Sequence, residues 1–161
     1  MSDPLSHFDP GGAAHMVAVT DKPEAPRTAV ARARIRVAPA TFVRISDGTA
    51  GKGDVLGVAR LAAISGAKRT PDLIPLCHPV RLTGITVVFT LREDLPGVEV
   101  RVEVAAVDRT GPEMEAMTAA AAAVLTIYDM CKAMDRGMVI EAVELVEKTG
   151  GKSGQWTRSG G

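Results

Sequence analysis

The stretch of sequence that decides the fold is Met114-Glu-Ala-Met-Thr-Ala-Ala-Ala-Ala-Ala-Val-Leu-Thr-Ile-Tyr-Asp-Met-Cys-Lys-Ala-Met134. Its only charged residues are Glu115, Asp129 and Lys132. A helix that is apolar nearly all round has no face to present to water, so we expect it to be buried all round. The five alanines at 119–123 also let another backbone approach closely. In a chain of 161 residues, this pattern predicts a subunit interface and a homo-oligomer.

The patterns on either side of this helix predict the rest of the fold. Apolar and polar residues alternate in four segments, as in strands, and Asp54 precedes a segment with helical spacing. Thr110-Gly-Pro-Glu113 resembles a capping box that opens the alanine-rich helix, and Gly137 ends it. The predicted elements are a strand at 28–37, a helix at 54–67, strands at 85–91 and 98–104, the helix from 110 to about 136, and a strand at 139–146. This βαββαβ order predicts an α+β, ferredoxin-like subunit whose helices cover one face of an antiparallel sheet.

The two ends of the chain are rich in glycine, proline and polar residues. We therefore expect a flexible arm at 1–26, a single domain at 27–150 and a flexible tail at 151–161.

Composition excludes several classes of function. Nineteen Lys plus Arg balance nineteen Asp plus Glu, so we expect no nonspecific attraction to nucleic acid or membranes. Five aromatic residues are too few for a base-stacking platform. We see no signal peptide and no membrane-flanked apolar run, and the two cysteines lack disulfide spacing. A cytoplasmic protein with reduced thiols is expected.

The charges of the alanine-rich helix predict a site. Glu115 and Asp129 are 14 positions apart, which brings them within about 40° of one stripe. The small residues Ala119, Ala122 and Thr126 between them leave room for a ligand. Lys132 follows Asp129 at i+3, which is also the spacing of an ordinary helix-stabilising pair.

Two loops and the tail offer further candidates. In residues 71–79, three prolines brace Cys77 and His78, which suit ligand binding or proton relay better than a metal site or a cysteine nucleophile. Lys52 lies between glycines just before a helix, which suits a phosphate or an ordinary flexible loop. The tail at 149–154 fails the full P-loop pattern, but Lys148 and Lys152 can still reach an anion as point charges.

Taken together, these strings resemble the molybdenum cofactor biosynthesis protein C family, the cyclic pyranopterin monophosphate synthases. The resemblance runs in order from about residue 14 to 155. The matching strings are His15-Met-Val17, Gly51-Lys-Gly-Asp54, Ala67-Lys-Arg-Thr70, Asp72-Leu-Ile-Pro-Leu-Cys-His-Pro79, Glu113-Met-Glu-Ala116, Leu125-Thr-Ile-Tyr-Asp-Met-Cys-Lys-Ala133 and Gly150-Gly-Lys-Ser-Gly154.

The resemblance implies a homohexamer, a trimer of dimers with active sites at dimer interfaces. It implies a lyase that converts a cyclised dihydro-GTP, supplied by a radical S-adenosylmethionine GTP cyclase, to cyclic pyranopterin monophosphate and diphosphate, without a metal or cofactor. It further implies that Asp129, Lys52 and Lys132 are catalytic. The substrate-binding candidates that it implies are Leu76, Cys77, His78, Met114, Glu115, Glu113, Arg27 and Lys148. The alternatives are a non-catalytic ferredoxin-like nucleotide-sensing module and a metalloenzyme that uses Cys77 and His78.

Overall fold

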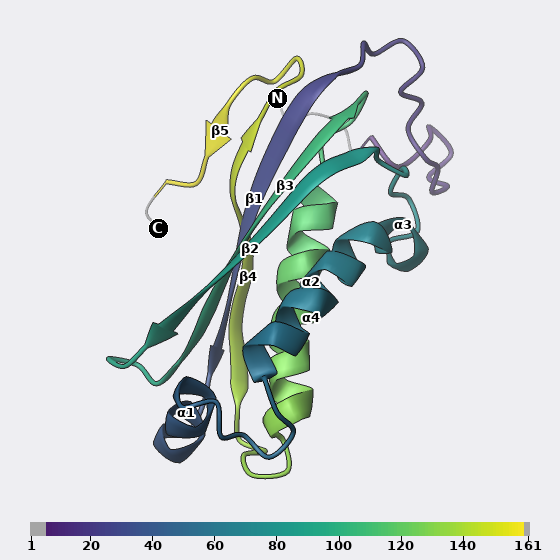
Figure 1. Ribbon diagram of the computed structural model, residues 1–161. Helices are drawn as coiled ribbons and strands as arrows, with labels where there is room; N and C mark the ends of the chain where they lie inside the picture. The colour runs from purple at the N-terminus through teal and green to yellow at the C-terminus, as the bar shows by residue number, and fades with distance from the viewer. Residues whose placement is uncertain (1–5, 160–161) are drawn as a thin grey trace.

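An antiparallel sheet with two long helices on one face forms the body of the molecule (Figure 1). The computed structural model describes residues 6–159. Its elements are β1 (Ala25–Arg36), α1 (Pro39–Ser46), α2 (Val55–Lys68), α3 (Thr70–Leu73), β2 (Leu82–Arg92), β3 (Gly97–Asp108), α4 (Glu113–Cys131), β4 (Val139–Thr149) and β5 (Trp156–Thr157). The strand order β2-β3-β1-β4-β5 confirms the predicted α+β, ferredoxin-like fold, with α2 and α4 as its two crossover helices.

The alternation in β3 explains why the helices cover only one face of the sheet. Val98, Val100, Val102 and Val104 are buried against the helices. Glu99, Arg101 and Glu103, which alternate with them, therefore point to the open face, as in a half-solvated sheet. β1 lies between β3 and β4 and contributes the small buried residues Ala29, Ala31 and Ala33, over which α4 packs closely.

Helix α2 packs against the alanines of α4. A Cβ built on Gly66 of α2 would lie 2.9 Å from the Cβ of Ala122 and 3.3 Å from the carbonyl oxygen of Thr118. The stripe formed by Ala119, Ala122 and Thr126 is thus filled by α2, and the expectation that it leaves room for a ligand is wrong. The alanine run also gives no argument for an oligomer, because its neighbour belongs to the same chain.

Several local predictions need correction. The capping box is wrong, because α4 begins at Glu113 with Pro112 at the N-cap and no side-chain cap hydrogen bond. The helix also ends at Cys131, before Gly137. The sequence did not predict α1, α3 or β5. Asp54 does cap α2, where its Oδ1 accepts a 2.8 Å hydrogen bond from the Gly57 amide.

The predicted arm at 1–26 and tail at 151–161 include residues 1–5 and 160–161, which lie outside the described residues.

Among residues 6–159, α4 is the one helix that is long and apolar enough to cross a membrane, and half of its apolar stretch is buried within the chain. A core helix of a globular domain meets the same criterion.

Replacing Gly66 with valine should destabilise the protein by about 1–3 kcal/mol, because the added methyl groups would force α2 away from Ala122 and Thr118. Urea denaturation measures this change. Ser65→Val, which places the same side chain on an exposed position of α2, should change stability by less than about 0.5 kcal/mol. Equal stability of the two variants would contradict the close α2–α4 packing.

Candidate functional site

The candidate residues form two clusters at opposite ends of α4. All eight predicted substrate-binding residues gather around its N-terminus, at the end of the molecule that carries the loop after α3 and the start of β1 (Figure 1). The three predicted catalytic residues gather at its C-terminus. Glu115 belongs to the first cluster and Asp129 to the second. The 14 helical residues that separate them span about 21 Å, at 1.5 Å per residue.

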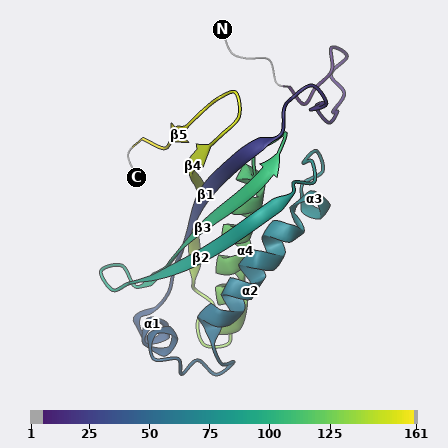
Figure 2. The ribbon, with the colours of Figure 1, turned by 45° about the horizontal axis from the view of Figure 1, so that its top comes forward.

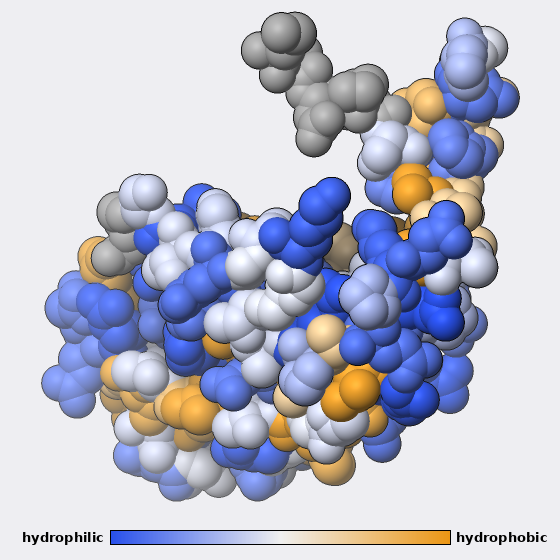
Figure 3. Space-filling view, turned by 90° about the horizontal axis from the view of Figure 1, so that it is seen from above, coloured by the Kyte–Doolittle hydropathy of each residue, from blue (hydrophilic) through white to orange (hydrophobic). Residues whose placement is uncertain are grey.

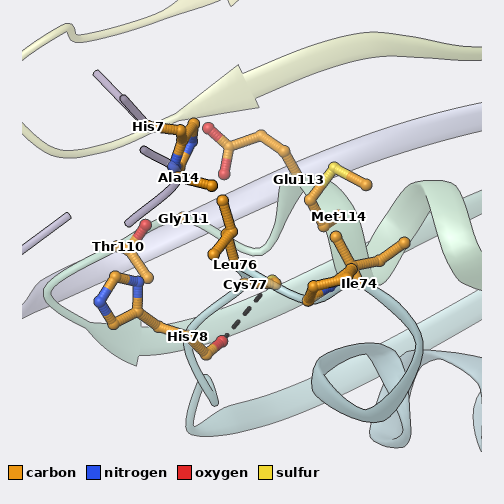
Figure 4. Close-up of a pocket in the computed structure, with 11 residues that line it drawn as sticks. His7, Ala14, Ile74, Leu76, Cys77, His78, Thr110, Gly111, Glu113 and Met114 are labelled. Carbon is orange, nitrogen blue, oxygen red and sulfur yellow. Dashed lines mark hydrogen bonds between the residues drawn. The ribbon is translucent and has the colours of Figure 1, made fainter. Parts of the chain in front are cut away.

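At the N-terminal end of α4 lies a cavity of about 600 Å³ with a mostly apolar lining (Figure 4). Five of the predicted residues line it directly: Leu76, Cys77 and His78 from the proline-braced loop, and Glu113 and Met114 from α4. The segment around His7 and Ala14 closes another side. An apolar slot with a few polar groups at its rim suits a flat heterocyclic ring.

Glu115 lies behind this cavity and is 1% exposed. Its Oε1 lies 3.8 Å from the Cys77 Sγ, whereas Oε2 has no hydrogen-bond partner among the described residues. Burial raises the pKa of the Glu115 carboxyl, and the nearby charge of Glu113 adds to the effect. Burial and the charge of Glu115 likewise raise the pKa of the Cys77 thiol to about 11, so Cys77 is a neutral thiol near pH 7 and a poor nucleophile.

A second cavity, of about 870 Å³, adjoins the first and shares Thr110, Gly111 and Glu113 with it. Five cations and two carboxylates line it: Lys22, Arg27, Arg109, Lys148, Lys152, Asp21 and Glu113. Figure 3 looks down on this end of the molecule and shows mostly hydrophilic residues there. This basic cavity can hold a polyanion, because guanidinium and ammonium groups converge on it.

Backbone contacts hold the guanidinium of Arg27 in place. Its Nε donates to the carbonyl oxygen of Asp108 at 2.8 Å, and Nη2 donates to that of Arg109 at 3.1 Å. On the other side of the cavity, Lys148 forms a 2.9 Å ion pair with Glu113. The sequence did not predict Lys22 or Arg109 as site residues. Neither belongs to a motif, and the fold alone brings them to this cavity.

At the other end of α4, two lysines share Asp129. Lys132 Nζ lies 2.6 Å from Asp129 Oδ1, while Lys52 Nζ lies 3.9 Å from Oδ2 and donates to the Asp129 carbonyl oxygen at 3.2 Å. The hydrogen bond and charge of Lys132, followed by the charge of Lys52, lower the pKa of Asp129, and Asp129 in turn raises the pKa of Lys132. The three residues thus form a cluster in which Asp129 stays ionised and Lys132 stays protonated near pH 7.

The single chain does not bury this end of the helix, so its predicted burial against another subunit stays a prediction. The side chains of Asp129 and Lys132 are 60% and 51% exposed in the single chain. Of Glu115, Asp129 and Lys132, only Glu115 has a buried side chain. Across residues 6–159, no group of three or more His, Cys, Asp and Glu side chains is placed to hold a metal ion.

A model of the MoaC family matches residues 16–151, which include all eleven residues predicted as catalytic or substrate-binding. The chain belongs to the MoaC family. This membership confirms the resemblance found in the sequence and places the protein in molybdenum cofactor biosynthesis. Most residues that line the two cavities, and the Lys52–Asp129–Lys132 cluster, therefore lie within the matched range. The lining residues outside it are His7, Ala14, Lys152 and Ser153.

Glu115 should make the folding stability of the protein depend measurably on pH. A carboxyl whose pKa is raised by folding favours the folded state below its ordinary pKa of 4.5, and this advantage is lost as the pH rises through the folded pKa. Glu115→Gln should therefore become more stable relative to the unmodified protein as the pH rises from 5 to 8, in thermal unfolding scans. Glu113→Gln, which breaks the Lys148 pair instead, should show no such gain. A Glu115→Gln protein that shows no such relative gain would contradict the raised pKa of the buried carboxyl.

Proposed function

We propose that the protein is a cyclic pyranopterin monophosphate synthase, a lyase that converts cyclised dihydro-GTP to cyclic pyranopterin monophosphate and diphosphate. The observation that carries the proposal is the adjacency of the two cavities. The apolar slot beside Met114 and His78 fits the heterocycle, and the basic cavity beside Arg27 and Lys148 fits the triphosphate. The shared residue Glu113 lies at the junction between them. Family membership supports the same pathway.

Each active site requires two copies of the chain. Proton transfer needs heavy atoms about 2.6–3.2 Å apart, whereas the two clusters of one chain are separated by about 21 Å of helix. We infer that the Lys52–Asp129–Lys132 cluster of one copy completes the substrate cavities of another, within a homohexamer built as a trimer of dimers. The exposed side chains of Leu61 on α2 and Leu125 on α4 offer apolar surface for such contacts.

The residues suit the chemistry of this reaction. Rearranging a purine ring to a pterin moves protons at several nitrogens, a task for Lys52, Lys132 and His78. Closing the cyclic phosphate while diphosphate leaves requires positive charge near the leaving group, which Arg27 and Lys148 supply. Asp129 keeps Lys132 charged and in place, since it accepts the hydrogen bond of that ammonium group. Lys52, on a glycine-flanked loop, then acts as the mobile acid or base.

The proposal extends to partners and location. The substrate is supplied by a radical S-adenosylmethionine GTP cyclase, and the protein works in the cytoplasm on a small molecule, without nucleic acid, membrane or cofactor. The predicted domain at 27–150 is the catalytic unit, and the arm at 1–26 and tail at 151–161 flank it. A non-catalytic nucleotide sensor would need the two cavities but would have no use for the Lys52–Asp129–Lys132 cluster at the far end of α4.

Variants of the charged cluster test the function directly. Lys52→Ala, Lys132→Ala and Asp129→Asn should each lower turnover of cyclised dihydro-GTP by about 10²–10⁴-fold, because each removes or misplaces a proton-transfer group. Diphosphate release measures turnover, and calorimetry should show that Lys52→Ala still binds the substrate. Arg136→Ala removes an exposed cation near the same helix end and should leave turnover unchanged. Unchanged turnover in all three cluster variants would overturn the assignment.

A further inference from the structure

The C-terminal segment folds back beside β4 and forms a hairpin with it (Figure 2). Two residue pairs join the strands, Glu147 with Thr157 and Lys148 with Trp156. The connecting loop at 150–154 turns through three glycines with positive φ, namely Gly150 (90°), Gly151 (73°) and Gly154 (65°). Lys152 and Ser153 lie in this loop and line the basic cavity.

The glycines let this loop lie against the base of the cavity. A Cβ at Gly151 would collide with the guanidinium of Arg27, and a Cβ at Gly150 would collide with the carbonyl oxygen of Pro26. A loop so rich in glycine has a large conformational entropy when nothing restrains it. Lys152 can therefore be held at the cavity only if both ends of the loop are fixed.

Arg158 fixes the far end of the loop to β4. Its backbone N–H donates to the Val146 carbonyl oxygen at 2.8 Å, and its Nε donates to that of Leu145 at 2.7 Å. The same Nε lies 3.6 Å from a carboxylate oxygen of Glu144, which Arg32 also holds. The guanidinium packs over the ring of Trp156, 5.9 Å from its centroid.

We propose that this C-terminal strand is a clasp that positions Lys152 over the basic cavity, with Arg158 and Trp156 as its positioning residues. The family model matches as far as residue 151, so the positioning residues Trp156 and Arg158 lie outside the matched residues. The inference rests on the proposed function in one respect, since it takes the ligand of the cavity to be the phosphate chain of a nucleotide. A preorganised lysine binds that chain without the entropic cost of ordering the loop.

Calorimetric titration of the full-length protein with inorganic diphosphate tests the clasp. Arg158→Ala and Lys152→Ala should each weaken diphosphate binding, by roughly three- to tenfold. The double variant should bind no more weakly than Lys152→Ala alone, because both changes act through the same ammonium group. Trp156→Phe, which keeps an aromatic ring under Arg158, should retain most of the affinity. Arg36→Ala removes a comparable ion pair with Glu141 at the opposite end of β4 and should have no effect.

The outcomes separate the clasp from the proposed function. Unchanged diphosphate binding in Arg158→Ala, or fully additive losses in the double variant, would overturn the clasp and leave the proposed function intact. Tight diphosphate binding that depends on Arg158 and Lys152, in a protein that fails to turn over cyclised dihydro-GTP, would support the clasp and contradict the reaction. Turnover without any diphosphate binding would show that the basic cavity does not bind the phosphate chain, and would overturn the clasp.

Discussion

The packing of α4 between the sheet and α2 is the constraint on which the rest of the structure depends. Its inner faces carry alanines that let β1 and α2 approach closely, and Gly66 of α2 meets it where a side chain would not fit. The unbroken helix from Glu113 to Cys131 sets the separation between Glu115 and Asp129. The two charged clusters are therefore two ends of one rigid element, and their separation is a property of the fold.

This separation shapes the chemistry that the protein can perform. One end of α4 carries the two cavities, where Cys77 is a neutral thiol and Glu115 is buried against it. At the other end, the charged side chains of Lys52, Asp129 and Lys132 lie on an open surface. The two-copy site proposed above would be complete only after subunits associate. Oligomerisation would then be a condition of catalysis as well as of stability.

The sequence predicted the sheet and its two crossover helices because period-two alternation and an all-apolar helix are strong signals. Val98 to Val104 and the alanines at 119–123 carried most of that information. The short helix α1 and strand β5 escaped prediction, because eight and two residues give too little pattern. The sequence did not predict the clasp for the same reason, because the contact of Arg158 with Leu145 arises only in the folded chain.

The sequence likewise predicted some residues of the candidate site and missed others. The motif strings identified Cys77, His78, Lys52 and Asp129 as candidates. Helical periodicity also predicted that the stripe between Glu115 and Asp129 has room for a ligand, but α2 packs there instead. Periodicity gives direction around a helix and says nothing of which element covers it. Lys22 and Arg109 reach the basic cavity only through the chain path, so no local pattern could reveal them.

Subunit complementation tests the two-copy site most directly. His78→Ala disables the binding end of α4 and Lys52→Ala disables the proton-transfer end, so each variant alone should be nearly inactive. Unfolded together in equal amounts and refolded, they should recover about a quarter of the unmodified turnover, because half of the random dimers are mixed and each mixed dimer has one intact site of two. Recovery of no activity in properly assembled mixtures would contradict the account and place each active site within a single chain.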